Sequence, residues 1–220
     1  PNEVILTSGG TESNNLAVLG MAEGARRKSA NKRTRVVLSA IEHDSVLDVA
    51  SILRSRGFEV VLARPGRDGV VSAEEVASHV DEATALVSVM AANNETGVIQ
   101  PTAAIDLDCA DADAVSVAAH KIGGPLGVGA VAMRTRCPFD AQSLGGGQEM
   151  GRRPGTQDVA GAVAFAAAAE QVCRELPSVR PQVEALANHI YERICAPGTG
   201  IIPTTVAHVD QTRLPGMVSV

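Results

Sequence analysis

Lys121 is the side chain in this sequence whose surroundings most favour covalent chemistry. It follows residues 114–117, a short apolar run that predicts a buried strand, and it precedes a Gly/Pro cluster that forbids a helix directly behind it. A lysine at a strand end lies where open α/β sheets keep their ligand crevices. A partly desolvated amine there can attack an aldehyde. The alternative is an ordinary surface lysine in a loop.

A second candidate site is the glycine-containing turn after the first predicted strand. Residues 3–7 predict that strand, and residues 16–25 predict the helix that follows the turn. The start of a helix presents free backbone N–H groups and the positive end of a dipole, which together can bind a phosphate. Gly10 and Thr11 are the candidate contacts. The alternative is a local N-cap, with Thr11 or Ser13 bonding its own helix.

Two more polar turns follow predicted strands. His43 lies between the strand predicted at 35–39 and a helix predicted from Asp44 to about Arg56, so its imidazole either caps that helix or stacks on a planar ligand. Asn94 lies in the turn after the strand predicted at 85–90. Parallel strands present their carboxyl ends at one edge of a sheet, where we expect these residues to meet.

The remaining elements indicate an α/β fold with a mostly parallel sheet and right-handed crossovers. Strands are predicted at 57–62 and 128–134, and Ser72 with Glu75 has the form of a capping box. A glycine-rich loop covers 145–156, and helices are predicted at about 159–175 and 179–194. Residues 213–220 read as the beginning of another strand.

The connection between Pro101 and Asp113 is too short for this pattern. A parallel crossover usually needs about a dozen residues including its helix, and no helical period is present there. We therefore expect that a segment is missing near Ile105 and Asp106. Either the sequence joins pieces of a longer protein, or the chain has lost a central strand.

Composition excludes several classes of protein. The 220 residues suggest one large or two small domains, and a net charge of −6 without a basic run argues against a direct nucleic-acid partner. No apolar run reaches membrane-spanning length, and no secretory signal opens the sequence. The four cysteines are scattered, which favours reduced thiols in the cytoplasm over a metal site.

Taken together, these segments resemble the cysteine desulfurases of the NifS/IscS type, class V aminotransferases of the fold-type I group that use pyridoxal phosphate (PLP). The matching segments follow the family's order and cover nearly the whole chain; they are 7–15, Glu42-His43, 93–97, His120-Lys121 with Gly124-Pro125, 145–156 and 213–215. The resemblance implies a PLP-binding large domain over 1–175, incomplete, and the beginning of a small C-terminal domain over 176–220.

The resemblance also implies roles for particular residues. Lys121 would bind PLP covalently and later move the Cα proton of the substrate, and His43 would stack on the pyridine ring. Gly10, Thr11 and His120 would contact the phosphate and Asn94 the ring's phenolic oxygen. Thr156 would reach the phosphate of a second subunit, which makes a homodimer part of the site.

Some positions depart from the family's pattern. Ala118 stands where a serine that binds the phosphate is usual, and Leu126 and Pro154 replace a basic residue and a serine. The strand that carries an aspartate for the pyridine nitrogen is absent between Asn94 and Lys121, at the same place as the short crossover. None of the cysteines matches the position of the sulfur-accepting cysteine.

The implied reaction converts L-cysteine to L-alanine and leaves a persulfide on the enzyme for a sulfur-acceptor protein, in iron–sulfur cluster assembly or in sulfur modification of tRNA or DNA. The alternatives are a selenocysteine lyase or related PLP lyase, and a non-catalytic scaffold for sulfur transfer.

Overall fold

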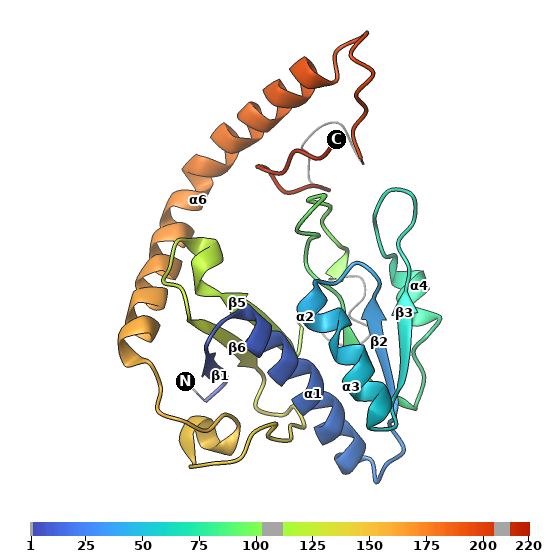
Figure 1. The fold of residues 1–220 in the computed structure, drawn as a ribbon, viewed down its shortest axis with the longest axis vertical. Coiled ribbons are helices and arrows are strands. Elements are labelled where there is room, and N and C mark those ends of the chain that lie inside the picture. The colour runs from blue at the N-terminus through green and yellow to red at the C-terminus, as the bar shows by residue number, and fades with distance from the viewer. Residues whose placement is uncertain (1, 103–111, 205–211) are drawn as a thin grey trace.

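The computed structural model describes residues 2–102, 112–204 and 212–220. One of its two sheets is fully parallel and has β2 in the middle, with the order β3-β2-β4 (Figure 1). Its strands are β2 (Arg35–Ser39), β3 (Glu59–Ala63) and β4 (Thr84–Ser88). β2 has the apolar, β-branched sequence of a strand covered on both faces, and Val36, Val37 and Leu38 are 0% exposed.

The second sheet has the order β1-β6-β5 and pairs its strands antiparallel. Its strands are β1 (Val4–Thr7), β5 (Ala114–Ala118) and β6 (Gly129–Met133). Because β6 runs opposite to both neighbours, β1 and β5 run in the same direction and end at the same edge.

Helix α1 (Gly10–Lys28) packs against both sheets. Its residues Val18, Leu19 and Ala22 join the core cluster around Val36 and Leu38 of β2. Its residues Leu16, Ala17 and Met21 pack with Ile5 of β1 and with Val131 and Met133 of β6. One helix therefore packs against both sheets and holds them together.

The contacts at the two ends of α1 show in which direction β4 and β5 run relative to this helix. A Cβ atom placed on Gly10 would lie 3.1 Å from Cβ of Ala118, so β5 ends beside the start of α1. Past the other end of α1, the N–H groups of Thr34 and Arg35 both donate to the carbonyl of Ala83, which directly precedes β4. β4 and β5 therefore both run antiparallel to α1, and their carboxyl ends lie at one edge of the molecule.

The expected single central sheet is present as two separate sheets. Within the described ranges, β4 pairs only with β2 and β5 pairs only with β6. The expected gap at Ile105 and Asp106 lies outside the described residues. The alternating strands and helices and the parallel pairing of β3, β2 and β4 follow the prediction.

Short helices flank the first sheet: α2 (Asp44–Leu47), α3 (Val49–Ser55) and α4 (Ala73–Ala77). The one helix expected from Asp44 to Arg56 is divided at Asp48, which is the C-cap residue of α2 and the N-cap residue of α3. The capping residue expected at Ser72 is confirmed, since its side chain accepts the Glu75 N–H at 3.1 Å. The Glu75 carboxylate instead accepts from the Arg64 N–H.

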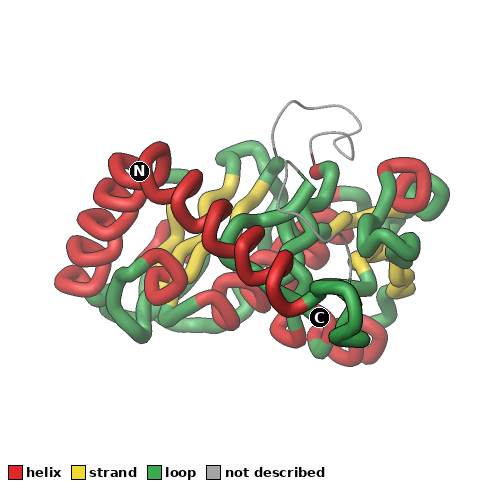
Figure 2. Tube along the Cα trace, turned by 90° about the horizontal axis from the view of Figure 1, so that it is seen from above, coloured by secondary structure: helices red, strands yellow, loops and turns green. Residues whose placement is uncertain are grey.

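Helix α6 (Val159–Ile194) is one continuous helix, so the prediction of two helices was wrong (Figure 2). Pro177 and Pro181 lie inside it. A proline removes a backbone donor and usually breaks a helix. Here the surrounding residues are exposed, so water can satisfy the carbonyls that lose a partner. The expected domain boundary between residues 175 and 176 lies within α6.

The C-terminal residues 212–220 form no strand, so that expectation was wrong. They lie against the turn at residues 93–98 instead, where Arg213 forms an isolated antiparallel bridge with Val98. Arg213 is 0% exposed and its guanidinium carbon lies 4.8 Å from the ring centroid of Tyr191 in α6. This contact connects the end of the described chain to the helix.

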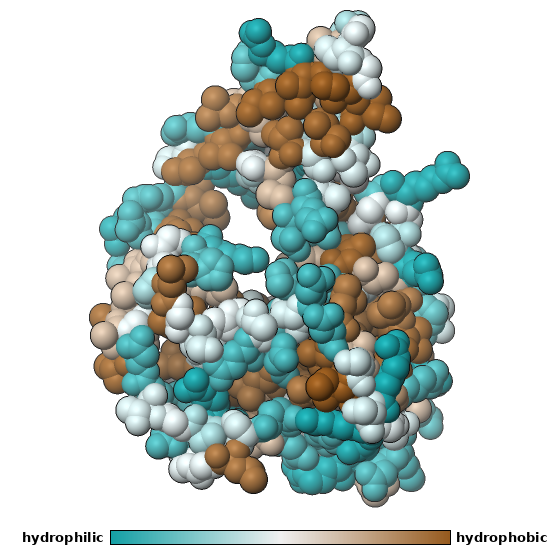
Figure 3. All heavy atoms as spheres, in the orientation of Figure 1, coloured by the Kyte–Doolittle hydropathy of each residue, from teal (hydrophilic) through white to brown (hydrophobic). Residues whose placement is uncertain are grey.

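Apolar side chains gather along the upper part of α6 and the segment beside it (Figure 3). Leu186, Ile190 and Ile202 are among the exposed residues there. No described helix, α6 included, combines the length and apolar character needed to cross a bilayer.

Candidate active site

The start of α1 is an uncapped helix end. Gly9 is the N-cap residue with φ 151°, a conformation that L side chains rarely adopt, and it has no side chain to bond the first turn. Ser13 hydrogen-bonds Thr7 at 2.7 Å and Thr11 is exposed, so the local N-cap expected as an alternative at Thr11 or Ser13 was wrong. The first-turn N–H groups of Gly10 and Thr11 remain available to an anion.

Small residues bring three segments together at this turn. A Cβ atom placed on Gly129 would lie 2.7 Å from the carbonyl carbon of Gly9, so the start of β6 backs directly onto the turn. Ala118, the last residue of β5, packs against Gly10 on another side. The turn and the strand that leads to Lys121 are therefore direct neighbours.

Lys121 lies in η1 (Ala119–Ile122), a single 3-10 turn that follows β5 without a break. Gly123 ends it with φ 79°, and the Gly124 N–H donates to the Ala119 carbonyl at 2.9 Å. The predicted position at a strand end is confirmed. His120 and Lys121 are both exposed, however, so the expected partial desolvation of the lysine is not seen.

His43 is the N-cap of α2, which confirms the capping alternative. Its Nδ1 accepts the Ser45 N–H at 3.1 Å and lies 2.9 Å from the Ser45 hydroxyl. That hydroxyl accepts from Asn14 Nδ2 at 2.8 Å, and Asn15 Nδ2 donates to the Ser45 carbonyl. The imidazole is thus held next to the first turns of α1, while the residue as a whole stays exposed.

The turn that carries Asn94 is shaped by its neighbour Asn93, a residue that the sequence analysis did not single out. Asn93 Oδ1 accepts the N–H groups of Glu95 and Thr96, and Asn93 Nδ2 donates to the carbonyl of Ile41 at 3.2 Å. Asn94 is exposed. An Asn that folds back on the next residues is the usual signal of such a turn.

Glu42 is a second residue to which the sequence analysis gave no role. It is 8% exposed, and its Oε1 accepts from the Ser88 hydroxyl at 3.2 Å, which connects the ends of β2 and β4. Burial raises the pKa of the Glu42 carboxyl, and the hydrogen bond from Ser88 only partly offsets that effect. Its position directly before His43 was the available signal.

Thr156 lies at the end of the glycine-rich loop, close to the same turn. With Thr7, Ser8 and Arg153 it lines a cavity of about 130 Å³ within its own chain. Arg153 binds Glu12 in the first turn of α1 through two hydrogen bonds. The expected reach of Thr156 to a second subunit stays a prediction.

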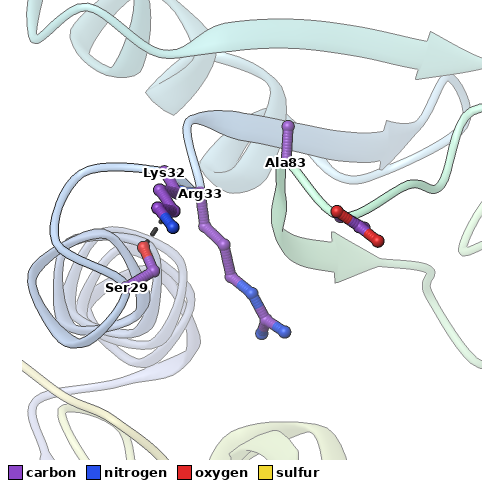
Figure 4. A pocket seen from close by; sticks show the side chains of 5 residues that line it. Ser29, Lys32, Arg33 and Ala83 are labelled. Atoms are coloured by element: carbon purple, nitrogen blue, oxygen red, sulfur yellow. Dashed lines mark hydrogen bonds between the residues drawn. The ribbon is translucent and has the colours of Figure 1, made fainter.

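A larger cavity, of about 400 Å³, lies at the opposite end of the molecule. Figure 4 shows Ser29, Lys32, Arg33 and Ala83 around it, beyond the end of α1 and before β4. None of the expected functional residues lines it. Within the part of the chain that the structure describes, no three His, Cys, Asp or Glu side chains form a cluster suited to a metal ion.

Comparison with known proteins gives a consistent family match. The model of the aminotransferase class-V family matches residues 1–109 and 101–220. An IscS-like cysteine desulfurase of Mycobacterium tuberculosis is 38% identical over 89% of this chain and 56% of its own length. A solved NifS-like protein superposes with a TM-score of 0.85 at 32% identity, covering 98% of this chain and 64% of that one.

The same comparisons bear on the segment expected to be missing near Ile105 and Asp106. The mitochondrial cysteine desulfurase of Eremothecium gossypii is 32% identical across all of this chain and 49% of its own length, over 246 aligned positions against 220 residues. The relative therefore has positions without a counterpart here. The two stretches of the family match overlap at residues 101–109, within the connection where the missing segment was expected. The chain spans about half the length of the curated relatives it matches.

Proposed function

The chain belongs to the aminotransferase class-V family, and from that premise we propose that it acts as a PLP-dependent cysteine desulfurase of the NifS/IscS type. The fold class expected from the sequence, that of the fold-type I PLP enzymes, is confirmed by the similarity to the solved NifS-like protein. The observation that carries the proposal is that β1, β2, β4 and β5 all end at one edge of the molecule, because the start of α1, His43, Asn94 and Lys121 follow these strand ends.

The residues present fit PLP at its phosphate and at its aldehyde. The uncapped first turn of α1, with Gly10 and Thr11, suits a phosphate because no side chain at Gly9 occupies the N–H groups and the helix end is positive. Lys121, on the strand end that packs against Gly10, would hold the aldehyde carbon.

Other side chains at this edge would orient the cofactor. The exposed imidazole of His43 is fixed by Ser45 and can cover one face of a flat ring. Asn94 would contact the phenolic oxygen, and His120 would stand beside the phosphate. Thr156 would add a hydroxyl to the phosphate of a partner chain in a homodimer.

When bound, PLP supplies an electron sink that lets the Cα–H and Cβ–S bonds of L-cysteine break. Lys121 would take the Cα proton of the substrate and act as a proton carrier. The sulfur would leave Cβ for an enzyme thiolate to form a persulfide, and a proton would replace it to give L-alanine. We name no cysteine of this chain as that thiolate.

We further propose a sulfur-acceptor protein as partner, and iron–sulfur cluster assembly or sulfur modification of tRNA or DNA as destinations. A cytoplasmic location is proposed from the scattered cysteines, of which Cys137, Cys173 and Cys195 are free thiols. The division into a large domain over 1–175 and the start of a small domain over 176–220 stays part of the proposal. A selenocysteine lyase would use the same residues.

The second candidate, a non-catalytic scaffold for sulfur transfer, is favoured by two observations. Lys121 is exposed, and the pairing edges of β4 and β5 that would flank a central strand have no partner among the described strands. A scaffold of this kind would not take up PLP.

Reduction with borohydride in the presence of PLP tests the proposal directly. We expect a stable adduct on the wild-type chain, located on Lys121 by peptide mass spectrometry, and no adduct in Lys121→Ala, since the substitution removes an exposed amine and no core volume. Circular dichroism of Lys121→Ala should match the wild type. A borohydride-stable PLP adduct that persists in Lys121→Ala, or the lack of any adduct in the wild type, would refute the assignment.

A further inference from the structure

The glycine-rich loop and the first turn of α1 are joined by a two-point ion pair. Arg153 Nε donates to Glu12 Oε1 at 2.9 Å and Arg153 Nη2 donates to Glu12 Oε2 at 3.3 Å. The side chains are only 22% and 31% exposed, respectively. Glu12 Oε2 also accepts the Ser8 N–H at 2.6 Å, so the carboxylate binds the turn before the helix as well.

This geometry leaves Glu12 strongly ionised. Burial alone would raise the pKa of its carboxyl, but the hydrogen bonds from Arg153 and Ser8 outweigh burial and lower the pKa below its usual value of 4.5. The pairing with Glu12 in turn raises the pKa of Arg153. The pair is therefore charged on both sides at neutral pH.

The position of Glu12 creates an electrostatic conflict. It occupies the third position of α1, where a carboxylate interacts favourably with the positive end of the helix dipole. The same dipole end and the same first-turn N–H groups are what a phosphate would use. An unpaired carboxylate there would repel the phosphate, and Arg153 supplies the opposite charge from outside the helix.

We propose that Arg153 is a charge-compensating positioning residue, which neutralises Glu12 and ties the glycine-rich loop to the turn so that a phosphate group can bind the start of α1. The inference rests on the part of the proposed function that assigns the phosphate to this turn. It needs no contact between Arg153 and the phosphate.

The inference predicts that substitutions of Arg153 and of Glu12 change the phosphate affinity in opposite directions. Arg153→Gln leaves the Glu12 carboxylate uncompensated and should weaken phosphate binding by about two- to thirty-fold, the range over which charges at a helix end act. Glu12→Gln removes the competing charge, can still accept the Ser8 N–H, and should leave phosphate binding unchanged or tighter. The double variant should return to within about twofold of the wild type.

The measurement is the free energy of unfolding in urea as a function of inorganic phosphate concentration at constant ionic strength. A ligand that binds only the folded chain raises this free energy in proportion to ln(1 + [L]/Kd), which yields an apparent Kd for each variant. Stability lost without phosphate does not enter this slope, so a variant that is merely less stable remains informative. Arg174→Gln, which breaks the exposed Arg174–Glu170 pair of α6, is the control for the same change in net charge.

A second readout compares PLP with pyridoxal, which lacks the phosphate. Arg153→Gln should reduce the apparent affinity for PLP and leave that for pyridoxal unchanged. Equal losses in Arg153→Gln and Glu12→Gln, a loss for pyridoxal as large as for PLP, or an effect of Arg174→Gln as large as that of Arg153→Gln would each overturn the inference.

The inference and the proposed function fail separately. If phosphate does not stabilise the wild-type chain, the inference is wrong even where Lys121 forms a borohydride-stable adduct. If the opposite-sign pattern is found and no adduct forms on Lys121, the inference stands and the desulfurase proposal falls.

Discussion

β2 and β5 have similar sequences and very different surroundings. Both are short and rich in valine, and both lead at the same edge into a candidate functional residue, His43 after β2 and Lys121 after β5. β2 lies between β3 and β4, and Val37 is 0% exposed, whereas β5 pairs only with β6 among the described strands and Val115 is 51% exposed. The contrast shows that burial of a strand is decided by its neighbours, which a strand's own sequence does not specify.

The same contrast extends to the residues that the strands position. His43 is held by Ser45, which α1 holds in turn through Asn14 and Asn15. Lys121 lies on a turn in which Ala119 is buried, but the Lys121 side chain itself is exposed. Around β2, the candidate residue His43 is therefore held in place by hydrogen bonds. Around β5, no described strand pairs with the second edge of the strand, and the Lys121 side chain is left exposed.

The largest expected effect comes from one substitution made in both strands. Val37→Ala removes methyl groups from a core formed with Ala63, Val71 and Val76, and should lower the free energy of unfolding by about 1.5–3 kcal/mol. Val115→Ala removes the same atoms from a half-exposed site and should cost less than about 0.5 kcal/mol. Urea unfolding measures both. Equal losses would mean that β5 is as well covered as β2.

The pH dependence of stability tests the organisation at the end of β2. The pKa of Glu42 is raised in the folded chain above its usual 4.5. The contribution of Glu42 to the free energy of unfolding is therefore fully present below about pH 4.5 and is lost as the pH rises through the folded-state pKa. Glu42→Gln stays neutral and can still accept from Ser88. We expect the variant to gain stability relative to the wild type as the pH is raised from about 4 to 8.

Urea unfolding across that pH range, for both proteins, measures this difference. Glu192→Gln makes the same chemical change at an exposed position of α6 and should run parallel to the wild type. If the free energy of unfolding of Glu42→Gln also runs parallel to that of the wild type across this pH range, burial does not raise the pKa of the Glu42 carboxyl.

The sequence was sufficient for the local features of this site. The strand at 35–39 and the position of Lys121 after a strand were predicted from apolar runs and glycines, which act over a few residues. Glu42, Asn93 and the Glu12–Arg153 pair were missed because their roles depend on contacts between distant segments. The break expected in α6 was wrong, because the helix continues through Pro177 and Pro181 on an exposed stretch where water can satisfy the carbonyls that lose a partner.

The smallest expected effect concerns the hydroxyl of Ser45, which connects His43 to α1. Ser45→Ala removes the partner of both His43 Nδ1 and Asn14 Nδ2 but keeps the N–H that His43 caps, so the loss should stay within about 0.5–1.5 kcal/mol. Ser78→Ala is the matched control, since that hydroxyl is exposed and donates only to the carbonyl of Glu75 in its own helix. Urea unfolding should therefore show a larger loss for Ser45→Ala than for Ser78→Ala. If the two variants lose the same amount, the hydroxyl of Ser45 does not hold His43 against α1, and the better organisation assigned to the β2 half must come from the packing of its strands alone.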